Sequence, residues 1–154
     1  MARPSFIAGS TALALLGCSV DERAAQIAVS NGWTREIAPG QSAAAVYLTI
    51  ANKGEGRDRL INVDSALGEA SLHMTSSADG VARMRPLEDG LEIAPGATME
   101  LKPGGTHIML TGIRRRPAAG QSIEFTLAFE RSGKRPITIR VMSAGGDGHS
   151  GHPM

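Results

Sequence analysis

The sequence predicts an all-β protein, built as a sandwich of antiparallel strands. Apolar and polar residues alternate with a period of two in residues 44–50, 123–129 and 137–141. This period places one face of a strand against a core and the other in solvent. Turn signals such as Asp79-Gly80 and Pro103-Gly104 separate the strand-like segments. No long stretch has helical periodicity, so we expect short strands in a β-sandwich.

Length and composition limit the classes of function. The chain has 154 residues, which is enough to close one hydrophobic core in a single domain. Its 16 basic and 15 acidic residues give a formal net charge of +1, and aromatic residues make up 3%. A balanced charge provides no electrostatic basis for nucleic-acid binding, and there are few rings to stack on bases. Nucleic acid is therefore not an expected partner.

The N-terminus has the pattern of an export signal. Arg3 supplies a positive charge, and residues 6–17 form an uncharged, mostly apolar run that is too short to span a bilayer. The run ends in Leu15-Leu16-Gly17-Cys18, which resembles the bacterial lipobox. That resemblance implies a signal peptide over residues 1–17 and a lipid on Cys18. The alternative is an ordinary signal peptide in which the cysteine occurs by chance.

These features predict a periplasmic lipoprotein of the bacterial cell envelope that contacts the membrane through its lipid anchor only. Which membrane holds the anchor stays open. After Cys18 we expect a polar tether to residue 25, a β-domain over residues 26–142 and a disordered tail over residues 143–154. Cys18 is the only cysteine. The folded domain therefore has no thiol for a disulfide, a cysteine nucleophile or a blue-copper site.

Four residues have the chemistry of a soft metal site. They are two histidines and two methionines: His73, Met84, His107 and Met109. Thioether sulfur is a soft, neutral donor that suits Cu(I), whereas Zn(II) prefers thiolate, imidazole or carboxylate. The sequence therefore predicts a Cu(I) site.

Strand geometry allows these four residues to meet. His107 and Met109 are two residues apart, so they share a strand face. If Asp79-Gly80 is a two-residue turn, Thr75 faces Met84 directly and His73 is the diagonal neighbour of Met84. We expect an exposed site, and we expect the other methionines of the domain to be structural: Met74, Met99 and Met142.

Each of these signals also has an ordinary structural explanation. A histidine on a strand is commonly solvated, and a methionine is commonly core filler. In the tail, His149, His152 and Met154 form either a second metal arm, suited to Cu(II), or a solvated segment. Residues 114–116, all arginine, form either a solvated loop or a docking patch for an acidic acceptor.

The spacing and the surrounding sequence resemble the periplasmic copper chaperone family known as PCu(A)C. Its signature is a His, ten residues, a Met, about twenty-one residues and His-x-Met, and the long gap here is twenty-two. Further similar text lies at residues 31–35, 45–52, 58–60 and 101–105. The resemblance covers roughly residues 27–141. It implies a cupredoxin-like or immunoglobulin-like Greek-key β-sandwich, with His73, Met84, His107 and Met109 as ligands.

The same resemblance implies a function. Family members carry Cu(I) to the binuclear copper centre of cytochrome c oxidase, often alongside a Sco-type partner. We see no catalytic constellation in the sequence and do not expect an enzyme. Three alternatives stay open: a copper-buffering or copper-resistance lipoprotein, a metal-free structural sandwich, and a zinc-dependent metalloenzyme.

Overall fold

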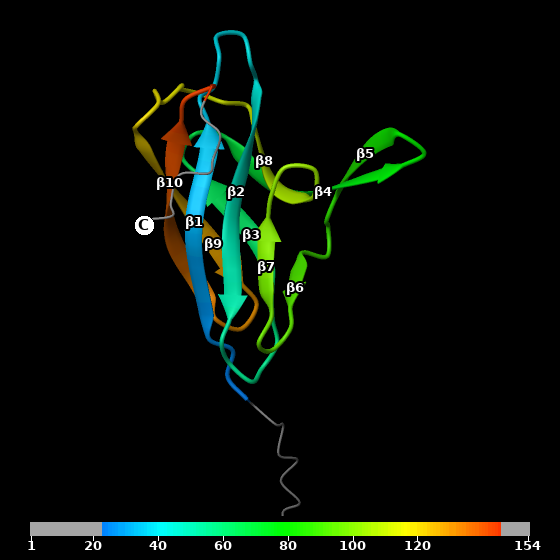
Figure 1. Ribbon diagram of the computed structural model, residues 1–154. Helices are drawn as coiled ribbons and strands as arrows, with labels where there is room; N and C mark the ends of the chain where they lie inside the picture. Colours follow the sequence, from blue (N-terminus) through cyan, green and yellow to red (C-terminus); the bar gives the residue numbers. More distant parts are fainter. Residues whose placement is uncertain (1–22, 146–154) are drawn as a thin grey trace, which may run out of the picture.

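The computed structural model describes residues 23–145 and has ten strands (Figure 1). They are β1 (Ile27–Arg35), β2 (Ala43–Asn52), β3 (Asp58–Ser65), β4 (Glu69–Ala78), β5 (Val81–Pro86), β6 (Leu91–Ile93), β7 (Thr98–Leu101), β8 (Thr106–Thr111), β9 (Ser122–Phe129) and β10 (Gly133–Met142). The three alternating segments of the sequence are β2, β9 and β10, as predicted. Within residues 23–145 there is no helix with the length and apolar character needed to cross a membrane.

The strands form one hydrogen-bonded path that curls around a single core. Their order is β5-β4-β8-β2-β1-β10-β9-β3-β6, and β7 pairs with β2 beside this path. All pairs are antiparallel except β1 with β10. In Figure 1, β1 and β2 lie in front of β9 and β3, so the two halves of the path face each other. This is the all-β, cupredoxin-like or immunoglobulin-like sandwich that the sequence predicted.

The core follows from the period of two. In β2, Val46, Leu48 and Ile50 are buried while the residues between them are only half-buried. Strands β8, β9 and β10 contribute their own alternate residues to the same hydrophobic cluster, and β3 contributes Leu60 and Val63 on either side of a register shift. Burying each such side chain stabilises the fold by about 1.5–3 kcal/mol before entropy is counted. The polar residues left on the other face of the sheet are the ones available for function.

A buried carboxylate anchors the start of β3. Asp58 accepts hydrogen bonds from the backbone N–H groups of Arg59 (2.8 Å), Arg131 (2.9 Å) and Ser132 (2.9 Å). Burial raises the pKa of Asp58, but hydrogen bonds from Ser132, Arg131 and Arg59 outweigh that effect and hold the pKa below its ordinary value. Asp58 therefore ties β3 to the β9–β10 turn.

The ends of the domain adjoin the segments expected to be tether and tail. The backbone carbonyl of Ala24 accepts a hydrogen bond from the N–H of Gly56 (3.2 Å), so packing begins inside the expected tether. The signal peptide, Cys18, His149, His152 and Met154 lie outside the described residues.

Candidate metal centre

The β4–β5 hairpin places Met84 as predicted. Asp79 and Gly80 have φ values of 53° and 74°, the left-handed conformations of a type I′ turn. The two-residue turn sets the register, with Thr75 opposite Met84 and His73 opposite Pro86. Beyond Met74, β4 pairs only with β5, and the hairpin projects from the sandwich (Figure 1). Met84 therefore lies on an edge strand, diagonal to His73.

Pairing between β4 and β8 brings the two predicted histidines together. His73 is the direct cross-strand partner of His107, and Ser71 is the partner of Met109. The imidazole centroids of His73 and His107 lie 6.2 Å apart, with 27° between the ring planes. Residues opposite or diagonal to each other on one strand face lie within about 4.5–8 Å. His73, His107 and Met109 thus occupy adjoining positions, and Met84 is one strand further out.

Two aromatic residues extend this group across the sheet. The ring of Tyr47 lies 6.4 Å from that of His107, and the ring of Trp33 lies 4.6 Å from that of Tyr47. Burial raises the pKa of Tyr47, and Arg35 partly lowers it, so the phenol is neutral at neutral pH. The ring of Tyr47 helps to cover His107, which is only 4% exposed. The expectation of an exposed site is therefore wrong for His107, while Met84 is 52% exposed.

Hydrogen bonds distinguish the two ring nitrogens of His107. Its Nδ1 lies 3.0 Å from the backbone carbonyl of Gly105. A carbonyl oxygen only accepts, so Nδ1 carries the proton and Nε2 keeps its lone pair. The same carbonyl accepts the backbone N–H of Thr75 (3.1 Å), which joins the base of the hairpin to this imidazole. His107 is thus oriented to present Nε2 as a ligand.

His73 has the opposite arrangement. Its Nε2 lies 3.0 Å from the Ser71 hydroxyl, while its Nδ1 is buried and has no hydrogen-bond partner. Buried polar atoms are nearly always satisfied, so an unsatisfied one indicates an absent partner. A metal ion held by imidazole and thioether would satisfy it. The residues present therefore fit a soft monovalent ion. Among residues 23–145, no three His, Cys, Asp or Glu side chains cluster at metal-binding distances.

The remaining methionines differ in role. Met99 packs against the hydrophobic core, as expected. The sulfur of Met74 instead lies 3.7 Å from the Arg85 guanidinium, on the hairpin face opposite Met84. Met142, expected to be structural, lines a surface pocket. It shares the outward face of β10 with Arg140, because the residue between them, Val141, points into the core.

Sequence reasoning did not identify Ser71 or Tyr47. Ser71 precedes His73 by two residues and therefore shares its face of the strand. The alternation of side chains along a strand could have identified Ser71 from the sequence. Tyr47 carries no such local signal, because its approach to His107 depends on β2 pairing with β8. Residues 114–116 are exposed in the loop after β8, where the N–H of Arg114 donates to the Leu67 carbonyl.

Comparison with known proteins places the chain in a family. Residues 27–141 match the family described as "Putative lipoprotein LpqE-like". The "Putative lipoprotein Lxx21020" of Leifsonia xyli subsp. xyli (strain CTCB07) is 31% identical over 144 residues, which are 87% of this chain and 86% of that protein.

Two solved structures show the same fold. The copper-bound PCuAC domain from PmoF2 is 27% identical, with a TM-score of 0.64 over 76% of this chain and 92% of that domain. The solution structure of CuI-DR1885 from Deinococcus radiodurans is 22% identical, with a TM-score of 0.60 over 77% and 78% of the two chains. At that identity, the second likeness concerns the fold alone. The chain belongs to the LpqE-like family and is of the PCu(A)C type that its sequence predicted.

Proposed function

We propose that this protein is a Cu(I) chaperone of the cell envelope, bound to a membrane through a lipid on Cys18, that delivers copper to the binuclear centre of cytochrome c oxidase. The ligands are His73, Met84, His107 and Met109. A Sco-type protein is a further partner in this scheme. The role is to bind copper and to hand it over rather than to catalyse a reaction.

The observation that carries the proposal is the pairing of His73 with His107 beside Met109. Two imidazoles and a thioether occupy adjoining positions on one sheet face, and a buried imidazole nitrogen lacks a partner. Met84 stands diagonal to His73 as a second thioether. Copper binding by the PmoF2 domain, which shares this fold, supports the same assignment here.

The different exposures of the ligands suit transfer. Met84 is half exposed on an edge strand, whereas His107 is buried under neighbouring rings. An incoming acceptor ligand can therefore displace the Met84 sulfur first, while the imidazoles still hold the ion. Neutral ligands leave Cu(I) its charge, and thiolate sulfur in an acceptor attracts that charge more strongly. Transfer from this site to a thiolate site should be favourable.

The test is a Cu(I) titration under reducing conditions followed by transfer. One Cu(I) should bind per chain, with two nitrogen and two sulfur neighbours by X-ray absorption. Binding should raise the free energy of unfolding by about 2.7 kcal/mol when free metal is 100 times the dissociation constant. A variant with both His107→Ala and Met109→Ala is the control and should bind no copper at this site.

The loaded protein is then mixed with the metal-free, soluble copper-bearing domain of the oxidase subunit. Stoichiometric appearance of copper in that domain supports delivery. Tight copper binding without transfer would instead indicate a copper-buffering lipoprotein. A first shell of oxygen and nitrogen only would exclude the proposed ligand set.

A further inference from the structure

The metal centre shares one cross-strand row with an arginine and a tryptophan. Trp33 is the direct partner of both Tyr47 on β2 and Arg140 on β10. Tyr47 contacts His107, and His107 faces His73. Since direct partners on neighbouring strands project from the same face, the row runs from Arg140 to His73 along one side of the sheet.

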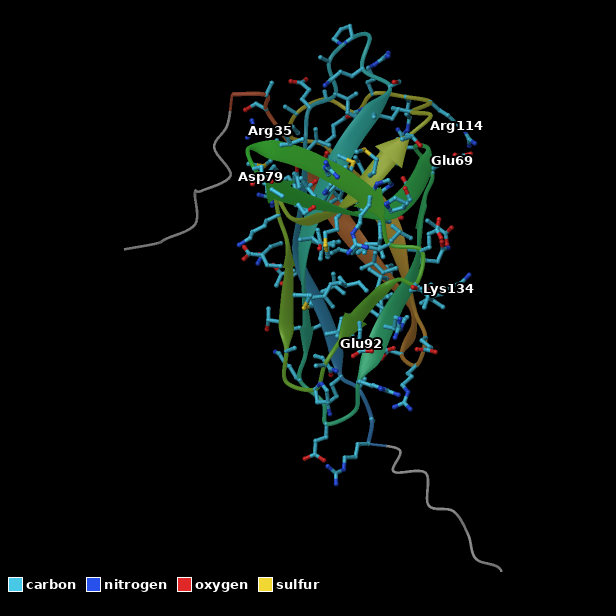
Figure 2. All side chains as sticks on the ribbon, turned by 90° about the vertical axis from the view of Figure 1, so that its right-hand side faces the viewer. Arg35, Glu69, Asp79, Glu92, Arg114 and Lys134 are labelled. Atoms are coloured by element: carbon cyan, nitrogen blue, oxygen red, sulfur yellow. The ribbon has the colours of Figure 1, made fainter. Side chains whose placement is uncertain are left out.

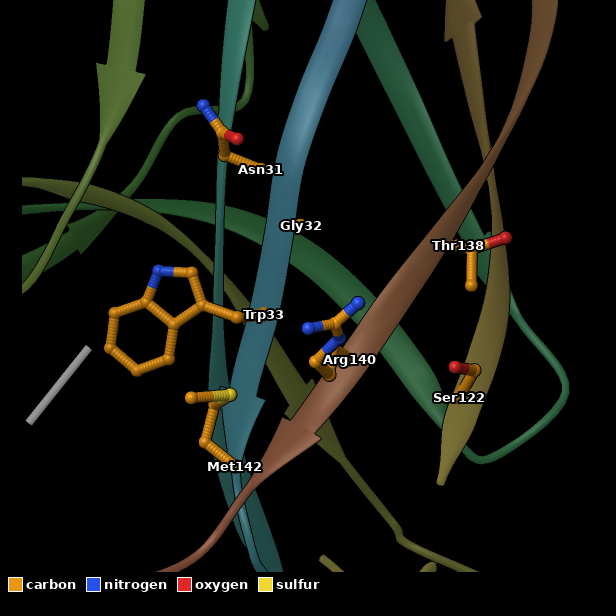
Figure 3. A pocket seen from close by; sticks show the side chains of 7 residues that line it. All are labelled: Asn31, Gly32, Trp33, Ser122, Thr138, Arg140 and Met142. Atoms are coloured by element: carbon orange, nitrogen blue, oxygen red, sulfur yellow. The ribbon is translucent and has the colours of Figure 1, made fainter. Parts of the chain in front are cut away.

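A pocket lies at the β1–β10 end of this row. It has a volume of about 430 Å³ and is lined by Asn31, Gly32, Trp33, Ser122, Thr138, Arg140 and Met142. Figure 3 shows Trp33 and Met142 on one side of the pocket, Thr138 and Ser122 on the other, and Arg140 between them. The lining combines a guanidinium with hydroxyl groups, an indole and a thioether. Such a lining suits a carboxylate-bearing side chain that also has apolar surface.

Charge is distributed very unevenly between the strands. Six consecutive strands of the sheet order, β5, β4, β8, β2, β1 and β10, carry one carboxylate, Glu69, and six cationic residues. The cations are Arg35, Arg83, Arg85, Lys134, Arg135 and Arg140. The other four strands carry one cation, Arg59, and five carboxylates: Asp58, Asp64, Glu92, Glu100 and Glu124. The half that holds the metal centre is therefore the cationic half of a chain with almost no net charge.

We propose that Trp33, Arg35, Arg140 and Met142, here called the Trp33 surface, dock an acidic acceptor protein beside the metal centre. The inference rests on the proposed function, because it identifies the partner of that site by its chemistry. A cationic surface attracts an acidic partner, speeds encounter and fixes its orientation. Tryptophan and arginine are also the side chains that most often dominate protein interfaces.

The geometry allows one partner to cover both features. Strand β10 lies three positions from β8 in the sheet order, which is about 14 Å at a spacing of about 4.8 Å per strand. A typical interface buries about 800 Å² on each side. A partner seated on the Trp33 surface therefore also reaches over His107 and Met109, where copper would leave.

The chain offers a matched control for the role of Arg140. Lys134 is an exposed cation on the same face of β10, and it precedes Arg140 by six residues, about 20 Å along an extended strand. Figure 2 shows Lys134 in the half of the molecule away from Arg35. Arg140→Ser and Lys134→Ser remove the same charge from the same strand, and both side chains are exposed, so both variants should fold.

The experiment uses the metal-free protein, labelled with ¹⁵N, and the metal-free soluble copper-bearing domain of the oxidase subunit as the probe. Trp33 is the only tryptophan, so its indole N–H gives one assignable signal. We expect this signal to shift on addition of the probe. Arg140→Ser should weaken association about tenfold at low salt, with a smaller loss at high salt, and Lys134→Ser should have little effect.

Specific outcomes would overturn the docking proposal. One is an unmoved Trp33 signal while signals from the hairpin or from residues 114–116 shift. Another is an equal loss from Arg140→Ser and Lys134→Ser, because this would show a response to net charge alone. Because the protein is metal-free here, a failure of docking is distinct from a failure of copper binding, which the titration measures separately.

Discussion

His73 and His107 are direct cross-strand partners, and their ring centroids lie 6.2 Å apart although 33 residues separate them in the chain. One ring is held by a backbone carbonyl and the other by a serine hydroxyl. We therefore expect the two histidines to contribute unequally to stability and to the proposed metal binding, and separate variants should distinguish them.

Replacing Met84 should affect copper, whereas replacing Met74 should not. Both residues lie on the β4–β5 hairpin, but only Met84 faces the side of His73. We expect Met84→Leu to weaken Cu(I) or Ag(I) binding at least about tenfold, because a soft ligand is lost. X-ray absorption should then show one sulfur neighbour in place of two. Met74→Leu, the matched control, should change neither quantity; equal effects of both variants would remove Met84 from the ligand set.

Ser71 should act as a positioning residue for His73. Its hydroxyl contacts Nε2, so Ser71→Ala leaves the imidazole free to rotate. Loss of such a supporting contact typically costs about 10–100-fold in metal affinity. Affinity should return in Ser71→Thr, which keeps the hydroxyl. The ¹⁵N shifts of His73 provide a second measurement, because only a loss of orientation would mix its two tautomers.

His107→Ala should destabilise even the metal-free protein. His107 is 4% exposed and bonds the Gly105 carbonyl, so its removal leaves a cavity and takes away one of the two donors to that carbonyl, which keeps the N–H of Thr75. We expect a loss of about 1–3 kcal/mol in the free energy of unfolding, measured with urea. His73→Ala should cost less, because His73 is more exposed and already has an unsatisfied nitrogen. The reverse order of stability would contradict the burial described for His107.

Peroxide should oxidise Met84 before Met99. Met84 is 52% exposed, while Met99 packs against the core. A sulfoxide no longer offers a thioether, so metal affinity should fall as Met84 oxidises. Bound Ag(I) should protect Met84 if its sulfur is a ligand. Peptide mass spectrometry measures both oxidation rates, and a rate at Met84 that is unchanged by Ag(I) would show that this sulfur does not hold the metal.

Acid should weaken the fold through Asp58. Because its pKa is lowered in the folded state, its charged form stabilises the protein at neutral pH. That contribution begins to be lost below about pH 5 and is lost fully as the pH falls through the folded pKa. Asp58→Asn should lower stability by about 2–3 kcal/mol at pH 7 and flatten the acid side of the stability curve. Exposed Asp64→Asn is the control, and urea unfolding at pH 7 and pH 3 measures both effects.

The sequence by itself determined the features that depend on local geometry. Alternation identified β2, β9 and β10, because a strand exposes every second residue to the core. The Asp79-Gly80 turn set the Met84–Thr75 register, because a two-residue loop leaves only one pairing. Because His107 and Met109 are two residues apart, the alternation of a strand also placed them on one face of β8.

The tertiary structure decided everything that depends on which strands become neighbours. No local signal pairs β4 with β8 or β8 with β2, yet these pairings place His73 opposite His107 and bring Tyr47 against His107. They bury an imidazole that the sequence suggested would be exposed. The same strand order gathers the cationic strands around the candidate metal centre. Strand order is decided when residues distant in the chain close one core. The periodicity of a single strand does not indicate which strands will pair with it.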